Sequence, residues 1–237
     1  MPAQHNPNKN PLVAGFHSRG YLPHLKSEGK SYFVTFRLAD TLPKSVLLEE
    51  RERIIQNALT HKRPLTWQEQ EDLFVWYSTK VDSYLDAGHG ECFLRQPRIA
   101  KLISDAIRFF EGQRYEMRAW VVVPNHVHAV VWPKPPNTLS AILHSWKSFT
   151  ANEANKILRR VKKSFWQEES YDHFIRDDDD MARCCRYTIY NPVNAGLCPV
   201  PHEWQWSSAY SVSTKLAAGM PPEPAGRDAC ATKPAYE

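Results

Sequence analysis

Two histidines separated by one residue form the part of this sequence best suited to chemistry. His126 and His128 lie in the apolar run 120–132 (Trp-Val-Val-Val-Pro-Asn-His-Val-His-Ala-Val-Val-Trp). In a β-strand, residues two apart point to the same face, so both imidazoles would lie side by side. Neutral imidazole is a common ligand of divalent metals. The alternative is a hydrogen-bonded pair at a sheet edge, because polar rings without partners are costly to bury.

A second segment, residues 187–197 (Tyr-Thr-Ile-Tyr-Asn-Pro-Val-Asn-Ala-Gly-Leu), offers a phenol and a carboxamide. If the preceding helix continues through it, Tyr187 and Asn191 lie on one face, about 5–6 Å apart. The carboxamide oxygen of Asn191 is a candidate third ligand for a metal held by the histidines. A tyrosine beside such a metal suits attack on a phosphodiester, which would leave a covalent phosphotyrosine. Tyr190, three residues further along, is a competing nucleophile.

Hydrophobic periodicity predicts the elements that position these residues. Strands are expected at 31–40, 116–123 and 126–132, with a short strand-like stretch within 165–174. Helices are expected at 45–60, at 66–86 after a capping box that begins at Thr66, from Pro97 to about 112, and at 138–160 and 178–190. We expect Pro192 to end the last helix or to begin its exit. This order favours an α+β fold with helices on one face of the sheet and a helical insertion at about 45–90.

Composition limits the class of protein. The chain has 237 residues, of which 42% are hydrophobic, enough for a single domain, which we expect at 16–211. Residues 1–15 and 212–237 are expected to be disordered. No apolar run reaches about 18 residues, so no contact with a membrane is expected. Five cysteines without metal-type spacing favour reduced thiols in a cytoplasmic protein. The net charge of +4 permits nucleic-acid binding without requiring it.

Basic side chains gather around the helix expected at 138–160 and the residues that follow it. Aromatic side chains lie among them, and phosphate neutralisation combined with base stacking is typical of binding to single-stranded or hairpin DNA. Trp146 and Phe149 could equally pack in the core. The expected DNA-binding residues of this region are Lys147, Lys156, Arg159, Arg160, Lys162, Lys163 and Trp166.

Acidic residues at 177–180 precede the last predicted helix. We interpret them as a solvated helix N-terminus, where the macrodipole favours negative charge, and not as the acidic cluster of a hydrolytic nuclease. Just before them, His173 and Arg176 could lie beside the metal or hold a phosphate. Packing against the sheet is an equal alternative for this segment.

In combination, these motifs resemble those of the HUH endonucleases, and in particular of the REP-associated tyrosine transposases, which are relatives of the IS200-like single-strand transposases. The resemblance covers about residues 16–210. It rests on the order and spacing of five segments, namely 18–24 (Ser-Arg-Gly-Tyr-Leu-Pro-His), 120–128, 171–177 (Tyr-Asp-His-Phe-Ile-Arg-Asp), 187–197 and 203–210 (Glu-Trp-Gln-Trp-Ser-Ser-Ala-Tyr).

The resemblance implies a ferredoxin-like antiparallel sheet with the histidines on a central strand and a C-terminal helix that carries the nucleophile. By position, the nucleophile would be Tyr187 and the third ligand of Mg²⁺ or Mn²⁺ would be Asn191, where insertion-sequence relatives have Gln. Arg19 would lie in an N-terminal arm that touches the DNA. Arg176 is also expected to contact DNA.

The implied function is that of a metal-dependent single-strand DNA endonuclease and strand transferase that cleaves hairpin-flanked DNA through a 5′-phosphotyrosine. One alternative is a catalytically quiet, hairpin-binding regulator on the same fold. Another is a metal phosphodiesterase acting on a small nucleotide, which would need a second His-x-Thr/Ser element that we do not find. Resemblance to the REP-associated group favours a monomer, whereas insertion-sequence relatives form dimers by helix exchange.

Overall fold

The computed structural model describes residues 15–18, 23–26, 29–42, 66–161 and 163–210. The helix expected at 45–60, residues 1–14 and residues 211–237 lie outside these ranges, so the predicted domain limits stay predictions. Within the described ranges, no helix is both long enough and apolar enough to cross a membrane.

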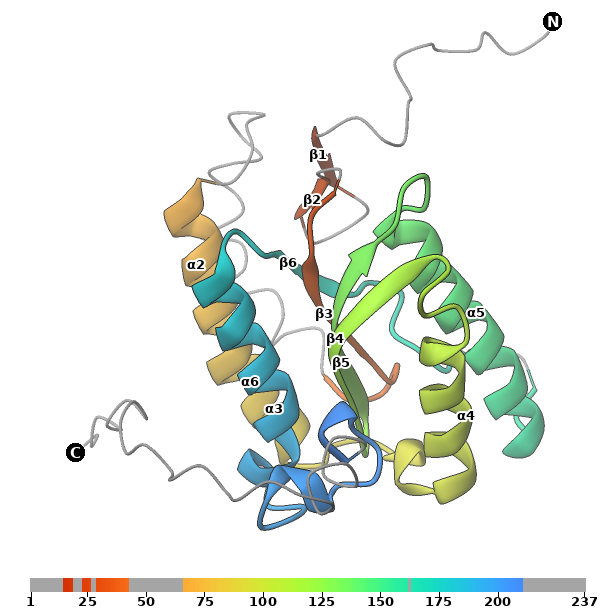
Figure 1. The fold of residues 1–237 in the computed structure, drawn as a ribbon. Coiled ribbons are helices and arrows are strands. Elements are labelled where there is room, and N and C mark those ends of the chain that lie inside the picture. Colours follow the sequence, from red (N-terminus) through yellow and green to blue (C-terminus); the bar gives the residue numbers. More distant parts are fainter. Residues whose placement is uncertain (1–14, 19–22, 27–28, 43–65, 162, 211–237) are drawn as a thin grey trace, which may run out of the picture.

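A four-stranded antiparallel sheet forms the centre of the molecule (Figure 1). Its strands are β3 (Tyr32–Arg37), β4 (Tyr115–Val123), β5 (His126–Pro133) and β6 (Tyr171–Phe174), in the order β4-β5-β3-β6. The two central strands are therefore the first and third along the chain, with helical crossovers between β3 and β4 and between β5 and β6. This is the ferredoxin-like arrangement, and the predicted α+β class is confirmed. A separate hairpin pairs β1 (Gly15–Ser18) with β2 (Pro23–Lys26).

Strands β4 and β5 form a hairpin that places the two histidines beside the first strand. Their turn is Pro124-Asn125, so the expectation of two strands is correct and the alternative of one bent strand is wrong. His128 lies opposite Thr35 of β3, and His126 lies opposite Arg37. Because alternate residues share a face, the histidines point to the same side of the sheet as Phe33 and not to the side of Val127.

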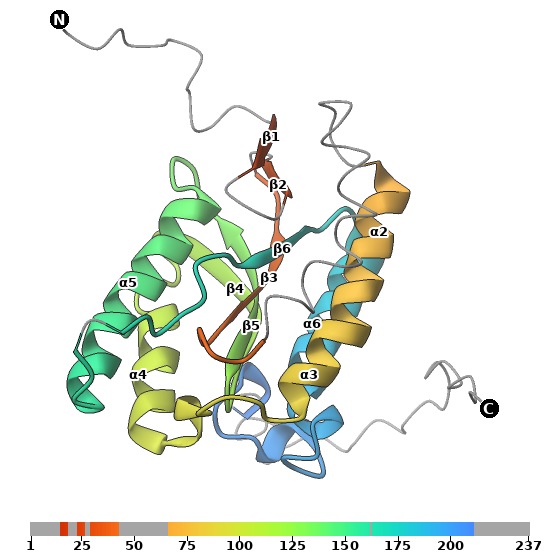
Figure 2. The same ribbon diagram turned by 180° about the vertical axis from the view of Figure 1, so that it is seen from behind.

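Helices cover both faces of this sheet (Figures 1 and 2). On one face lie the crossover helices α4 (Pro97–Arg108) and α5 (Leu139–Ile157), packed on a core that includes Val34, Val127 and Ala129. The expectation of helices on one face holds for these two only. On the other face lie α6 (Asp178–Asn194) and the insertion, with a second core that includes Phe33, Phe74 and Val130. The histidines belong to this second face.

The insertion is helical from Trp67 to Asp86. It consists of α2 (Trp67–Trp76), a π-helical turn (Tyr77–Val81) and α3 (Asp82–Asp86). The predicted capping box is present, since Thr66 and Glu69 bond to each other's backbone N–H groups. A short 3₁₀ turn (Phe93–Arg95) then leads into α4, which begins at Pro97 as expected.

Helix α6 continues past the residue expected to end it. Pro192 lies inside the helix, which extends to Asn194, so it does not end the helix but stands where the exit begins, the second of the two predicted alternatives. Only two residues follow Pro192 within the helix. Because proline has no backbone N–H, Pro192 removes one backbone hydrogen bond, and it does so in the last turn, where the helix tolerates the loss. The chain then passes through a 3₁₀ turn (Pro201–Glu203), and Trp204 donates its indole N–H to the Val122 carbonyl of β4 at 2.9 Å.

Candidate active site

The two histidines form a closely spaced, buried pair on a central strand. His126 is 1% exposed and His128 is fully buried, and their Nε2 atoms are 3.0 Å apart. The alternative placed the histidine pair at a sheet edge. That position is wrong, because β5 is paired with a strand on both sides. Side chains on the same face, including Phe33, which stacks on His128 with ring centroids 5.4 Å apart, exclude water from the pair.

The other nitrogen of each imidazole is bonded to a neighbouring side chain. Asn125 donates its amide N–H groups to the Leu85 and His89 carbonyls, at 2.8 and 3.3 Å, which turns its oxygen toward His126. That oxygen accepts from Nδ1 of His126 at 2.8 Å. Nδ1 of His128 lies 2.7 Å from the Thr35 hydroxyl, which can accept in the same way. Bonds of this kind set the tautomer that leaves Nε2 as a metal ligand.

Burial keeps both imidazoles neutral, which is the state that binds metals. It lowers the pKa of His128 to about 3 and, together with the nearby His128 and Arg37, lowers the pKa of His126 well below its usual value. The 3.0 Å separation also fits octahedral coordination. With ligand distances of about 2.1 Å, adjacent corners of an octahedron are about 3.0 Å apart.

A buried carboxylate from the insertion faces the histidine pair. Oδ2 of Asp82 lies 3.8 Å from Nε2 of His128, and the side chain is almost fully buried. Ligand atoms of Asp82, His126 and His128 all lie within 4.8 Å of one another. Asp82 is not among the residues predicted from the sequence. The sequence shows an acid among the apolar residues of the helix predicted at 66–86. This pattern indicates that the acid could be buried, but it does not indicate which residue the acid contacts.

Asn191 is buried near this carboxylate group. Its side chain donates a hydrogen bond to Asp86, one turn after Asp82, and burial raises the pKa of Asp86 to about 6. The Asn191 Oδ1 atom is also buried, with no hydrogen-bond partner within the described part of the chain. A buried amide oxygen of this kind is suited to coordinate a hard cation.

Tyr187 lies beside the histidines, as the family resemblance implies. Its ring centroid is 5.4 Å from that of His128 and 5.6 Å from that of Phe33, with edge-to-face geometry. Tyr190, the competing nucleophile, is 45% exposed, because three residues along the helix turn it away from the sheet. Of the two phenols, the structure thus brings Tyr187 to the pair.

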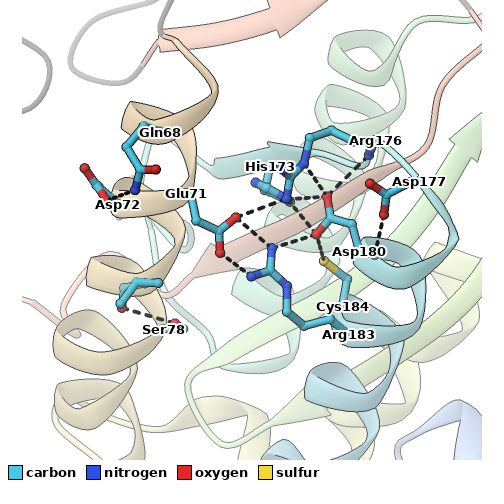
Figure 3. Close-up of polar contacts among 11 residues, drawn as sticks. Gln68, Glu71, Asp72, Ser78, His173, Arg176, Asp177, Asp180, Arg183 and Cys184 are labelled. Carbon is cyan, nitrogen blue, oxygen red and sulfur yellow. Dashed lines mark hydrogen bonds and ion pairs between the residues drawn. The ribbon is translucent and has the colours of Figure 1, made fainter.

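An ionic network joins α6 to the insertion (Figure 3). Asp180 accepts hydrogen bonds from His173, Arg176 and Arg183, at 2.9, 3.1 and 2.7 Å. Both arginines also pair with Glu71 of α2. The expectation of a solvated acidic run is wrong for Asp180, which is buried because these donors compensate its charge. Arg176 is engaged here and not presented to a phosphate, and His173, which belongs to β6, is buried against Phe74 of α2.

Two of the residues expected to bind DNA have structural roles. Trp166 is buried, packs edge-to-face on Phe36 and donates its indole N–H to Thr150 at 2.8 Å. It cannot stack on a base, so this prediction is wrong. In the sequence, Trp166 follows Phe165 and several basic residues, and this pattern does not distinguish a core residue from a surface one. Lys147 donates to the Glu168 carbonyl at 2.6 Å and to Ser170 at 3.1 Å, which engages its ammonium group within the fold.

The other predicted basic residues lie at the end of α5. Lys156, Arg159 and Lys163 are exposed, although Lys156 also pairs with Glu153 at 2.6 Å. The Arg160 guanidinium lies over the Phe93 ring, 4.5 Å from its centroid. Arg19 and Lys162 lie outside the described residues, so their DNA contacts stay predictions.

Comparison with known proteins identifies the family that these features resemble. Residues 95–188, which include both histidines and Tyr187, match the family model "Transposase IS200 like". The resemblance is confirmed. A Haemophilus influenzae relative named as a REP-associated tyrosine transposase is 28% identical over 130 residues, 48% of this chain and 74% of that protein. The REP-associated tyrosine transposase of Escherichia coli K12 is 26% identical over 111 residues, 43% of this chain and 59% of that protein.

A solved structure of a REP-associated tyrosine transposase bound to a REP hairpin is also similar, at 20% identity and a TM-score of 0.45, with 93% of this chain and 98% of that chain covered. The fold assignment rests on the strand order described above. The family match and the relatives support a transposase-type, DNA-processing function.

Proposed function

We propose that this protein is a metal-dependent single-strand DNA endonuclease and strand transferase that acts on hairpin-flanked DNA. The observation that carries the proposal is the position of Tyr187 beside two buried, neutral histidines whose Nε2 atoms face each other. A buried tyrosine without the histidines, or a histidine pair without the tyrosine, could have a purely structural role in the core. A nucleophile beside two nitrogen ligands suits phosphoryl transfer, and the Asn191 amide oxygen, which has no hydrogen-bond partner among the described residues, is the proposed third ligand.

In this proposal, His126, His128 and Asn191 hold Mg²⁺ or Mn²⁺. When bound, the metal would act as a Lewis acid on the non-bridging oxygens of the scissile phosphate and would favour the phenolate form of the nearby tyrosine. The Tyr187 oxygen attacks phosphorus, and the bond to the 3′ oxygen breaks. The products are a 5′-phosphotyrosine and a free 3′-hydroxyl end, and attack by a 3′-hydroxyl reverses the step and rejoins a strand.

The exposed basic residues at the end of α5 support DNA as the partner. Arg159 and Lys163 are exposed, make no side-chain contact of the kind that engages Lys147 within the described part of the chain, and lie where the chain leaves the helix. Phosphate contacts from such residues position a strand or hairpin without reading its sequence. We propose that the protein acts as a monomer, as the resemblance to the REP-associated group implies.

Covalent capture of DNA tests the nucleophile. Labelled hairpin DNA with a single-stranded flank, incubated with Mg²⁺ or Mn²⁺, should give an adduct that survives denaturing electrophoresis. Tyr187→Phe should abolish it and Tyr190→Phe, the matched control, should retain it. An adduct with Tyr187→Phe would refute the assignment. Hairpin binding unaffected by chelation, with no adduct from the wild type, would instead favour the regulator.

A further inference from the structure

The strongest unexplained group near the site is the carboxylate of Asp82. We infer that Asp82, supplied by the helical insertion, is a direct ligand of the metal held by His126 and His128. The inference rests on the proposed function only in requiring the same divalent cation. It gives the insertion a chemical role, because α3 would complete a metal site whose other ligands come from β5 and α6.

Burial without hydrogen bonds is the first argument. Neither oxygen of Asp82 has a hydrogen-bond partner among the residues that the structure describes, although the residue is only 2% exposed. A buried carboxylate normally pairs with a cation or accepts several hydrogen bonds. The potential ligand atoms around it are those of His126 and His128, and the three atoms all lie within 4.8 Å of one another. A divalent cation is the partner that compensates this carboxylate.

The donor set is the second argument. Two imidazole nitrogens and a carboxylate are typical ligands of divalent transition metals, and Mn²⁺ accepts both nitrogen and oxygen donors. The 3.8 Å between Oδ2 of Asp82 and Nε2 of His128 lies between the edge and the diagonal of an octahedron with about 2.1 Å bonds, which are about 3.0 and 4.2 Å. A small rotation of the carboxylate is enough to reach either position.

The next turn of the same helix supports this assignment. Asp82 and Asp86 stand at i and i+4, so both carboxylates project from one face of α3. Asp86 accepts the amide N–H of Asn191 and thereby orients its oxygen. The insertion thus supplies one ligand, Asp82, and one positioning residue, Asp86. The complete protein ligand set would be two nitrogens and two oxygens.

Mn²⁺ binding to the DNA-free protein tests the inference without relying on activity. Isothermal titration should show one tight site in the wild type. Asp82→Asn, which keeps the shape and removes the charge, should weaken Mn²⁺ binding by at least about tenfold, since even substitutions of groups behind the ligands cost 10–100-fold. Asp72→Asn, an exposed acid on α2 of the same insertion, is the matched control and should bind Mn²⁺ as the wild type does.

The outcomes separate this inference from the proposed function. If the wild type binds no Mn²⁺, the proposed metal dependence fails. If the wild type binds Mn²⁺ and Asp82→Asn binds it equally well, the role of Asp82 is refuted while the proposed function stands. Should Asp82→Asn not fold, as judged by its melting curve in EDTA, a Mn²⁺-soaked wild-type crystal decides. An anomalous peak within about 2.6 Å of the carboxylate supports the inference, and a peak at the histidines alone overturns it.

Discussion

Asp180 is predicted to be the residue on which the attachment of α6 to the insertion most depends. Asp180→Asn keeps the size of the side chain but removes the charge that His173, Arg176 and Arg183 share. Breaking a fully buried pair costs about 3–5 kcal/mol. The Asp180 side chain is 2% exposed, but its arginine partners are 18% and 37% exposed and keep Glu71, so we expect a smaller loss than for a fully buried pair, about 2–4 kcal/mol.

Thermal and urea unfolding measure this loss. For a chain of this size, about 2–4 kcal/mol corresponds to a fall in melting temperature of roughly 4–16 °C. Asp179→Asn makes the same chemical change in the same helical turn, but Asp179 is exposed. It should cost no more than about 1 kcal/mol, the value of a carboxylate at a helix N-terminus. Equal losses for the two variants would refute the reasoning, because burial would then have no effect.

The pH dependence of stability gives an independent check. Burial alone would raise the pKa of Asp180, but the bonds from His173, Arg183 and Arg176 outweigh it and hold the pKa below its usual value. A carboxylate with a lowered pKa stabilises the fold fully above the unfolded value of about 4 and loses that contribution as the pH falls. The stability difference between wild type and Asp180→Asn should therefore narrow below about pH 5. A difference that stays constant down to pH 3 contradicts the assignment.

Three further predictions concern the site and its surroundings. Asn125→Ala removes the acceptor that orients His126, so Mn²⁺ affinity measured by titration should fall about 10–100-fold; unchanged affinity would show that the bond is dispensable. Trp166→Ala should lower the free energy of unfolding in urea by about 3–5 kcal/mol, as for a core tryptophan; a stable variant with weakened hairpin binding would restore the stacking role. Replacing Arg159 and Lys163 by Gln should reduce the salt slope of hairpin binding by about 1.8, the value for two lost phosphate contacts; an unchanged slope places the DNA elsewhere.

Local sequence patterns predicted the elements that carry the nucleophile and the histidine pair. Alternation along β5 placed His126 and His128 on one face, and helical spacing placed Tyr187 and Asn191 on another element facing them. Both patterns depend only on the geometry of single elements. The facing of the two elements followed from the family resemblance, and the structure agrees.

These local patterns could not predict contacts between residues that are distant in the sequence. Asp82 meets a histidine 46 residues later, and Glu71 meets an arginine 112 residues later. No periodicity encodes such pairs. For Trp166, the sequence shows an aromatic residue near lysines, and only the packing of α5 against the sheet decides that it is buried.

The π-helical turn at Tyr77–Val81 sets the phase of the insertion. A π turn adds one residue to the helical path, and each residue of an α-helix rotates its successors by about 100°. Before the turn, Glu71 is directed to α6, and after it, Asp82 and Asp86 are directed to the histidines and Asn191. Deleting one residue from the turn would leave every ligand in the sequence but rotate both carboxylates away from the site. The length of this turn is therefore as important to the proposed metal site as the proposed ligands themselves.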